Sequence, residues 1–289
     1  MVISRLTGGL GNQMFQYAVG RAIADRHSSA LGLDISEYEQ DTSRRYALDQ
    51  FAIRAEVMGK GRLDALGLAT GDSITMLGRR LLGRWNSAGT YRERHFHFDP
   101  NVERLRPPIY LVGYWQSERY FTGIAQHLRE EFVPRTPASE ANQRMLEFIH
   151  NHLSISLHVR RGDYVTDRRT NAFHGVCPVS YYERALAHME RIAPSARLFV
   201  FSDDQQWAAE NIRSNLPTTH VMVNGPGEAV WDLILMKNCH HHVIANSSFS
   251  WWAAWLSPSP KKVVIAPRHW LKSDTNETDD RVPSDWIRI

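Results

Sequence analysis

The sequence predicts an α/β protein made of two Rossmann-like domains. Three observations lead to this class: short apolar strands alternate with helical segments, the strands are apolar enough for burial on both faces, and turn-rich loops follow them. A chain of 289 residues is long enough for two domains of roughly 150 residues each. Residues 133–139 contain two prolines and are the best candidate linker, so we expect domains at residues 1–135 and 136–289.

The first domain opens with a predicted strand–loop–helix–strand unit. A β-prone run at residues 2–6 leads through a turn-rich loop into a helical apolar pattern at residues 14–27, and residues 30–36 form the next strand. Residues 37–105 are less regular. An apolar strand follows at residues 107–115, and Ser117 is a usable N-cap for a helix that we expect to reach Glu131.

The second domain shows the alternation most clearly. Helices are expected at residues 139–153, 179–193, 203–216, 228–239 and 248–256, and strands at residues 154–160, 196–202, 220–224, 241–246 and 261–267. Sheets of this kind bind ligands at the carboxyl ends of their strands, where the loops lead into helices. The loops at those ends are therefore the places to search for a site.

Composition and charge exclude several classes. The net charge of +3 is too small to argue for nucleic acid, although a mildly basic chain suits an anionic small molecule. Cys177 and Cys239 form no zinc spacing or disulfide framework, as in a reducing compartment. The first residues resemble neither a signal peptide nor a membrane anchor, so we expect a cytoplasmic protein with no transmembrane segment.

The tryptophans at positions 251, 252 and 255 are expected to fill the core.

The first loop, GGLGNQMF, leads into a helix. It lacks the third glycine of a dinucleotide fingerprint and the Gly-Lys-Ser/Thr ending of a P-loop. Gly11 allows close approach of a ligand to the backbone, while Asn12 and Gln13 offer amides to hydroxyl groups. An equally good interpretation is a tight turn in which Asn12 caps the helix.

The second loop contains HVRRGDYV. Strand periodicity places His158 and Arg160 on the same side, with Arg160 at the tip of the strand, where a guanidinium can bind phosphate bidentately. Gly162 permits the sharp turn. Asp163 can fix an arginine, and the simplest alternative is a surface ion pair between Arg161 and Asp163. An adhesion motif is a poor interpretation for a cytosolic chain.

Two further loops carry polar clusters. In FSDD, Asp203 and Asp204 stand where a strand ends and a helix begins; we favour helix capping over a metal or a base, with Asp203 ordering the arginine loop. The histidines at 240–242 alternate between sheet faces, which argues against a shared metal.

The last of these loops is NSSFS. Asn246, Ser247 and Ser248 precede a helix whose first amides form an anion cradle. A plain N-cap is compatible with that use.

Taken together, GGLGNQMFQYA, GYWQSERYF, HVRRGDYV, FSDD and VIANSSFSWWAAWL resemble the galactoside alpha-1,2-fucosyltransferase family, glycosyltransferase family eleven. The resemblance implies an inverting, metal-independent transferase of GT-B architecture that moves L-fucose from GDP-β-L-fucose to the 2-hydroxyl of a terminal galactose. It implies that the C-terminal domain binds the donor and the N-terminal domain the acceptor. No cofactor is implied.

The resemblance also assigns donor-binding residues. It implies that Arg160 holds the β-phosphate, that the loop of Ser247, Ser248 and Phe249 binds phosphate, and that Asp232 reads guanine. Asn12 matches the asparagine of the relatives' glycine loop. Gly9 stands where some relatives outside the alpha-1,2 branch carry an arginine, so no role of that arginine is carried over.

The sequence does not single out a catalytic base. Asp163 lies beside the phosphate-binding arginine, and His158 is a second candidate for a catalytic or positioning role. Glu93 and Asp34 are weaker candidates.

The acceptor is expected to contact His97, Trp115 and Gln116, with Trp115 stacking on the galactose ring.

Three alternatives stay open at this stage. A dinucleotide-dependent oxidoreductase would bind a nicotinamide cofactor, a non-catalytic carbohydrate-binding protein would bind glycans without turnover, and a transferase of the same fold could use another sugar nucleotide. Under the favoured interpretation the partners are GDP-fucose and a galactose-terminated glycan, and nucleic acid is not among them. A bacterial enzyme of O-antigen biosynthesis, with peripheral association at the inner face of the membrane, is the expected setting.

Overall fold

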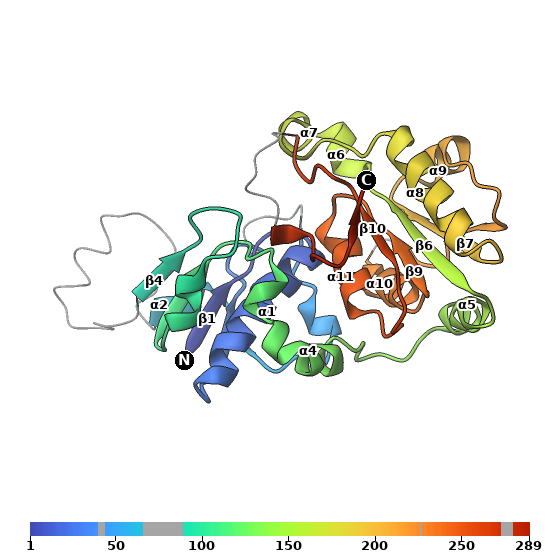
Figure 1. The fold of residues 1–289 in the computed structure, drawn as a ribbon. Coiled ribbons are helices and arrows are strands. Elements are labelled where there is room, and N and C mark those ends of the chain that lie inside the picture. Colours follow the sequence, from blue (N-terminus) through green and yellow to red (C-terminus); the bar gives the residue numbers. More distant parts are fainter. Residues whose placement is uncertain (40–43, 66–88, 226, 273–279) are drawn as a thin grey trace. The chain divides into compact units, whose positions relative to one another are not determined.

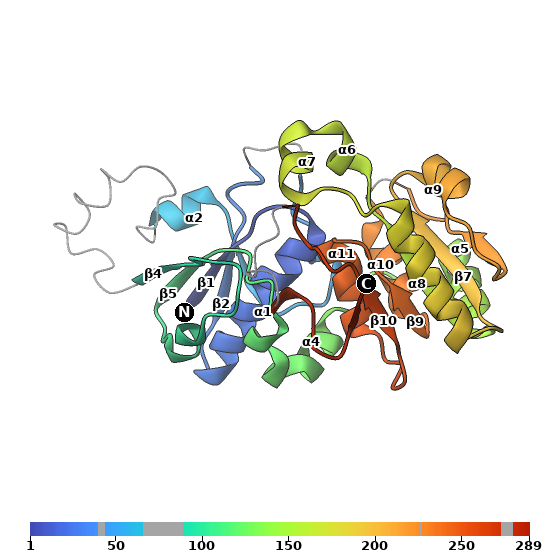
Figure 2. The ribbon, with the colours of Figure 1, turned by 45° about the horizontal axis from the view of Figure 1, so that its top comes forward.

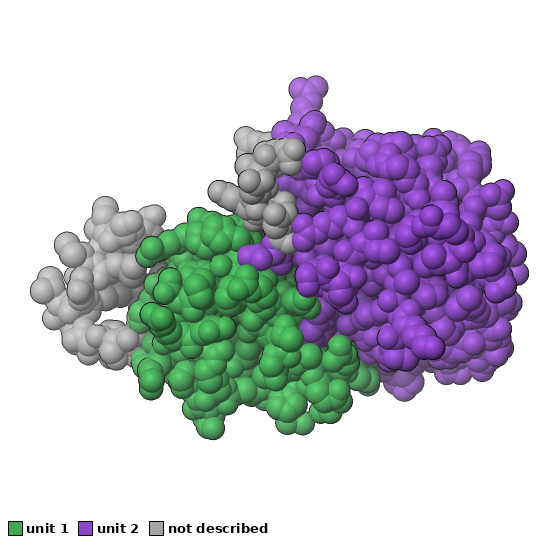
Figure 3. Space-filling model, viewed as in Figure 1, with its two compact units in different colours: residues 1–135 green, residues 136–289 purple. Residues whose placement is uncertain are grey.

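The computed structural model describes residues 1–39, 44–65, 89–225, 227–272 and 280–289 (Figure 1). These residues divide into two compact units, Met1–Arg135 and Thr136–Ile289, which Figure 3 colours separately. Each unit is built on one parallel sheet with helices packed against it. The α/β class and the parallel sheets expected from the sequence are therefore confirmed.

The first unit contains a parallel sheet in the order β3–β2–β1–β5–β4. Its strands are β1 (Val2–Arg5), β2 (Leu31–Asp34), β3 (Glu56–Met58), β4 (Gly89–Arg92) and β5 (Ile109–Val112). Its helices are α1 (Leu10–Arg26), α2 (Lys60–Ala65) and α4 (Ala125–Glu131), with short 3₁₀ turns η1 (Leu48–Gln50), η2 (Pro100–Arg104), η3 (Glu118–Tyr120) and η4 (Thr122–Ile124). The two edge strands, β3 and β4, escaped the sequence analysis because they are partly exposed and lack an apolar pattern.

The helix expected between Ser117 and Glu131 is only half correct. The structure has two 3₁₀ turns in the first half, and α4 begins at Ala125. Ser117 is buried and its side chain caps no helix. The neighbours Tyr120 and Phe121 are both buried, and the backbone leaves helical geometry at Phe121, with φ −140° and ψ 8°. Burying two consecutive aromatic rings therefore accompanies the break in the helix.

The second unit contains a parallel sheet in the order β11–β10–β9–β6–β7–β8. Its strands are β6 (Ser154–Val159), β7 (Arg197–Ser202), β8 (Thr218–His220), β9 (His241–Val243), β10 (Val264–Ala266) and β11 (Ile287–Arg288). Its helices are α5 (Glu140–His150), α6 (Gly162–Thr166), α7 (Arg168–His174), α8 (Val179–Ile192), α9 (Gln205–Asn211), α10 (Ala229–Lys237) and α11 (Ser248–Leu256). The sequence analysis missed α6, α7 and β11, which are short, and placed β8 slightly too late.

Strand β6 lies in the middle of this sheet, between β9 and β7 (Figure 1), and all its residues are buried. Figure 2 shows α8 lying against the same sheet, beside β7. One face presents Ile155, Leu157 and Val159 to an apolar cluster that includes residues of α8 and α9. The opposite face carries Ser154, Ser156 and His158, all buried. Polar side chains inside a sheet need hydrogen-bond partners, because an unpaired buried polar group costs about 1–3 kcal/mol.

The histidine run supplies two of those partners. Ser154 Oγ lies 2.9 Å from His240 Nδ1, and Ser156 Oγ lies 2.8 Å from His242 Nδ1. His241 Nδ1 accepts a hydrogen bond from the Val263 amide at 3.0 Å. The three histidines therefore hydrogen-bond within the sheet.

The tryptophans of α11 are core residues, as expected. Trp251, Trp252 and Trp255 are buried and pack on one another, and Trp286 joins them beside Trp251. Their rings are therefore not available as a sugar-binding platform.

Both cysteines are buried free thiols. Across the part of the chain that is described, no helix has the length and apolar content needed to cross a bilayer.

The buried His242 should make folding sensitive to acid. Burial lowers the pKa of His242 to about 3, from an ordinary value of 6.5. Between these values the unfolded chain takes up a proton that the folded chain refuses, so the free energy of unfolding falls as pH drops through this window. We expect His242→Asn to reduce the pH dependence of the unfolding free energy by up to ~1.4 kcal/mol per pH unit near pH 5. Denaturant titrations at pH 7 and pH 5 give the unfolding free energies of both proteins. The same pH dependence in the wild type and in His242→Asn would contradict the assignment.

Candidate active site

Three adjacent strands of the second unit carry the candidate donor residues to one edge of the sheet. β6 pairs with β7 on one side and with β9 on the other, all parallel, and Val159 is in register with Ser202. Arg160, Asp203 and Ser247 follow the ends of these three strands. The chain order of the sheet thus gathers segments that lie more than 40 residues apart in sequence.

Asp203 fixes the position of Arg160. Its Oδ2 lies 2.8 Å from Nη1 of Arg160, and its Oδ1 accepts a hydrogen bond from the backbone amide of Arg161 at 2.8 Å. Both side chains of the ion pair are 25% exposed, so the guanidinium still reaches solvent. At Gly162 a Cβ atom would lie only 2.5 Å from Asp203 Oδ2, which explains the glycine. The expectation that Asp203 orders the arginine loop is confirmed.

Arg161 is held by residues at the start of α9. Its Nε lies 3.2 Å from Asp204 Oδ2, and its guanidinium stacks 4.0 Å from the ring centre of Trp207. Asp204 also caps α9 by accepting from the Trp207 amide at 3.1 Å. The side chain of Asp163 lies outside the described part of the chain, although its backbone belongs to α6.

His158 lies beneath this loop as a neutral, buried imidazole. It is 6% exposed, and burial lowers its pKa to about 4, an effect that Asp203 opposes and Arg160 reinforces. Its Nδ1 has no hydrogen-bond partner among the described residues, and its ring centre lies 5.7 Å from that of Phe249. A neutral imidazole of this kind can donate or accept one more hydrogen bond.

The N-terminus of α11 faces the same edge. Ser247 is the N-cap residue, and the Trp251 amide makes the first hydrogen bond to its carbonyl, at 3.0 Å. Helix geometry leaves the preceding amides, those of Ser248, Phe249 and Ser250, without a partner inside the helix. No acidic residue occupies the first turn. These amides, with the positive end of the helix dipole, are able to bind an anion.

Asn246 has a structural role that argues against the donor contact expected for it. Its Nδ2 lies within 3.0–3.3 Å of the carbonyl oxygens of His174, Gly175 and Trp270, and its Oδ1 accepts from Cys177 Sγ. The side chain is 3% exposed. It joins three backbone segments behind the start of α11, and these segments take both hydrogens of its Nδ2.

Asp232 belongs to a partly buried network with two asparagine amides. Its Oδ1 accepts from Asn224 Nδ2 at 2.8 Å, and Asn224 exchanges two hydrogen bonds with the side chain of Asn142. Burial raises the pKa of this carboxyl. The sequence analysis missed Asn142 and Asn224, which hold the carboxyl in one orientation.

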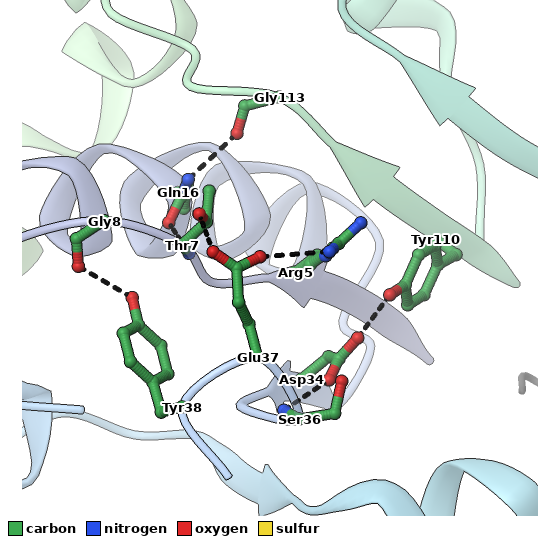
Figure 4. A network of polar contacts seen from close by, with 10 residues as sticks. All are labelled: Arg5, Thr7, Gly8, Gln16, Asp34, Ser36, Glu37, Tyr38, Tyr110 and Gly113. Carbon is green, nitrogen blue, oxygen red and sulfur yellow. Dashed lines mark hydrogen bonds and ion pairs between the residues drawn. The ribbon is translucent and has the colours of Figure 1, made fainter. Parts of the chain in front are cut away.

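In the first unit, hydrogen bonds from the side chains of Gln16 and Tyr38 hold the glycine loop, residues 8–11, and the segments beside it (Figure 4). Gln16 Oε1 accepts from the Thr7 amide at 2.9 Å, while its Nε2 donates to the carbonyl of Gly113 at 3.1 Å. Tyr38 donates its hydroxyl hydrogen to the Gly8 carbonyl at 2.9 Å. The ends of β1 and β5 are thereby joined through α1.

The three residues expected to bind the donor in this loop differ in availability. Gln13 is buried; it donates to the carbonyls of Gly8 and Arg45 and accepts from the Ala47 amide, so its side chain holds the loop together. Asn12 caps no helix, because the N-cap is Gly9 and has no side-chain bond. Gly11 lies buried in the first turn of α1.

Asn12 and Gln116 lie together in the structure. Gln116 Nε2 donates to Asn12 Oδ1 at 2.8 Å. A residue expected at the donor thus touches one expected at the acceptor, and both side chains are partly exposed.

Trp115 cannot stack on a sugar as expected, because its side chain is 0% exposed. It packs between Tyr91 and Tyr120, with a backbone φ of 57°. Its neighbour Tyr114 is 39% exposed and offers the ring that Trp115 does not. His97 is exposed and stacks on His95, with ring centres 3.4 Å apart.

The two weaker base candidates are occupied. Glu93 accepts from the backbone amides of Tyr114 and Trp115, at 2.6 and 3.0 Å, which holds that turn. Asp34 is buried, accepts from the Ser36 amide at 2.8 Å and from the Tyr110 hydroxyl, and lies inside the sheet (Figure 4).

The sequence analysis missed Glu37. Its carboxylate reaches the end of β1, where Thr7 donates to one oxygen and Arg5 lies 3.0 Å from the other (Figure 4). Glu37 is 31% exposed in its side chain. No motif marks it, because the loop after β2 has no regular pattern.

A search of the described residues for three or more His, Cys, Asp or Glu side chains that could hold a metal ion finds no such group.

Comparison with known proteins decides the family. The model of the family described as Glycosyl transferase family 11 matches residues 97–289. The chain belongs to this family. It is therefore a glycosyltransferase, and the oxidoreductase and non-catalytic alternatives are set aside.

Two bacterial relatives match over their whole length. An alpha-1,2-colitosyltransferase of Escherichia coli is 33% identical over 295 residues, covering 100% of this chain and 99% of the relative. The O-antigen biosynthesis glycosyltransferase WbnK, also of Escherichia coli, is 32% identical over 311 residues, covering 99% of each. Among solved structures, the fucosyltransferase NodZ from Bradyrhizobium has a TM-score of 0.50 at 17% identity, over 89% of this chain and 93% of that one. That likeness concerns the fold alone.

A matched pair of substitutions tests the role of Asp203 in this glycosyltransferase. Asp203→Ala removes the carboxylate that orients Arg160, and we expect kcat to fall roughly 10- to 100-fold because a misplaced group loses its transition-state contact. Asp204→Ala removes a helix cap and the partner of Arg161. It should cost ~1 kcal/mol of stability and leave kcat near that of the wild type. Equal kcat values for the two variants would contradict the assignment.

Proposed function

We propose that this glycosyltransferase moves L-fucose from GDP-β-L-fucose to the 2-hydroxyl of a terminal galactose, with inversion and without a metal. The proposal includes a GT-B arrangement in which the second unit binds the donor and the first unit the acceptor. The observation that carries it is Arg160, held by Asp203 at the strand edge that also bears the N-terminus of α11. Both supply positive charge to a phosphate.

The chemistry requires that charge at the leaving group. As the bond between the anomeric carbon and the β-phosphate oxygen breaks, negative charge grows on GDP and positive charge on the sugar ring. Arg160 is permanently protonated, and the amides of Ser248 and Phe249 are already aimed by the helix. Donors that need no reorganisation are typically worth about 3–4 kcal/mol each in the transition state.

In this scheme, removal of the proton from the acceptor hydroxyl needs little general-base catalysis. His158 has a pKa of about 4, so it is neutral and a weak base at pH 7, and we propose that it positions the phosphate by a hydrogen bond. Glu93 and Asp34 are already committed to the fold. If departure of GDP runs ahead of attack, the acceptor hydroxyl becomes acidic only as its oxygen bonds to the sugar. Asp163 remains the proposed base candidate.

The acceptor is proposed to lie against the first unit, at Tyr114, Gln116 and His97. Tyr114 offers an exposed ring for the apolar face of a galactose. Gln116 offers its remaining amide hydrogen to a hydroxyl. The acceptor in the cell is proposed to be a bacterial O-antigen glycan, because one of the whole-length relatives is an O-antigen glycosyltransferase.

GDP-colitose is a second candidate donor, because one whole-length relative is a colitosyltransferase. Colitose is L-fucose without its 3-hydroxyl group. A site that hydrogen-bonds this hydroxyl can reject the deoxy sugar by factors on the order of 10⁴, whereas a site that leaves it unbound discriminates weakly. The ratio of kcat/KM for the two GDP-sugars therefore distinguishes the candidates.

The first experiment is transfer to lactose in the presence of EDTA. We expect fucosyl-lactose from GDP-fucose despite chelation, and loss of about 100-fold or more in rate for Arg160→Ala. Arg161→Ala is the matched control: it removes the adjacent guanidinium, which stacks on Trp207, and should keep most of the activity.

Near-normal turnover by Arg160→Ala would refute its role. If only GDP-colitose is used, the fucose assignment fails while the family assignment stands. Loss of all transfer on chelation would refute the metal-independent mechanism.

The acceptor site is tested at Tyr114. Tyr114→Ala should raise the KM for the galactoside about 3- to 10-fold, the usual contribution of an aromatic contact, while the KM for the donor stays unchanged. Tyr114→Phe keeps the ring and should restore the acceptor KM. Trp115→Ala should instead unfold the protein more easily, by about 3–5 kcal/mol, because Trp115 is core. An unchanged acceptor KM in Tyr114→Ala would remove Tyr114 from the site.

A further inference from the structure

The second unit contains a basic cavity beside β10 and β11. Its volume is about 430 Å³, and its lining consists of Arg184, Arg268, His269, Arg288 and Ile289. Arg184 comes from α8, Arg268 and His269 follow β10, and Arg288 belongs to β11. Among the described residues, no aspartate or glutamate side chain lines this cavity, which we call the arginine cavity.

Positively charged side chains gather in the arginine cavity. Its three guanidinium groups stay charged at every relevant pH. Arg288 donates to the carbonyl of Val282 at 3.0 Å, which helps to position it. Arg184 and Arg268 are exposed, and no ion pair to either is found within the described residues.

The arginine cavity is separate from the proposed phosphate site. Arg160 follows β6, whereas Arg268 follows β10, and β9 lies between those strands. Neighbouring strands are about 4.8 Å apart, so the two strand ends are roughly 10 Å from each other. Arg160 is also held by Asp203, which belongs to β7 on the opposite side of β6.

An exposed aromatic residue contacts the segment that leaves the cavity. The segment that carries Arg268 and His269 continues to Lys272, whose amide donates to the Phe173 carbonyl at 3.1 Å. The side chain of Phe173 is 43% exposed. Val165, 47% exposed, lies in α6, which packs on α7. A soluble anion needs no apolar neighbour, whereas a bilayer surface offers both phosphate groups and apolar chains.

We propose that the arginine cavity binds the phosphate of an anionic membrane lipid, with Phe173 entering the interface beside it. The cavity volume admits a phosphate headgroup, and three arginines can bind its oxygens bidentately. The site would hold the enzyme at a bilayer through bonds distinct from those of donor and acceptor. It does not depend on which sugar is transferred.

Co-sedimentation with vesicles tests the proposal. Wild-type protein should bind vesicles of phosphatidylcholine mixed with phosphatidylglycerol and bind pure phosphatidylcholine weakly. Arg184→Gln/Arg268→Gln should weaken binding about 20-fold, since each basic residue near an anionic surface contributes roughly fivefold. The matched control Arg191→Gln/Arg213→Gln removes the same charge from exposed positions elsewhere on this unit and should bind like wild type. Phe173→Ser should also weaken binding.

The proposal would be overturned if the wild type bound both vesicle types equally, or if the control pair lost as much vesicle binding as Arg184→Gln/Arg268→Gln. It would also be overturned if calorimetry showed that inorganic pyrophosphate binds the cavity while vesicles do not bind. That result would assign the arginine cavity to a soluble phosphate. Transfer to lactose by Arg184→Gln/Arg268→Gln should match wild type and report that the variant is folded. Loss of that transfer together with vesicle binding would contradict a separate site.

Discussion

The parallel pairing of β6 with its two neighbours determines where the polar groups of the proposed donor site lie. Because all three strands run the same way, the segments after them share one edge, and Arg160, Asp203 and the start of α11 meet there. The ion pair, the glycine beside it and the helix dipole all presuppose this arrangement. An antiparallel strand in the middle of the sheet would carry its loop to the opposite edge.

Amide side chains, rather than helix caps, position much of the backbone in the loops at the strand ends. Gln13, Gln16 and Asn246 are buried, and each bonds to backbone groups of segments distant in sequence. An amide has both donors and acceptors, so one side chain can satisfy several loop groups that have no partner in a strand or helix. We therefore expect these three amides to be necessary for the conformation of the loops.

Much of the fold was predictable from sequence, since buried parallel strands and amphipathic helices leave strong apolar patterns. Arg160 and the α11 cradle were predictable too, because their positions follow from where a strand ends. The role of an amide was not: nothing local distinguishes Asn12, which is partly exposed, from Gln13, which is buried. Likewise Tyr114 and Trp115 are adjacent, and only the tertiary packing decides which ring is exposed. Glu37 and the edge strands lie where the sequence has no periodic pattern.

The serine–histidine contacts beneath β6 have a consequence for how the strand finds its place. A strand buried on both faces could slide by two residues and keep the same side chains on each face. Here such a slide would set Ser156 against His240 and leave His242 facing His158, with one hydrogen-bonded pair lost and two imidazoles buried together. The polar pairs thus select a single alignment of the strand, and with it the height at which Arg160 emerges from the sheet.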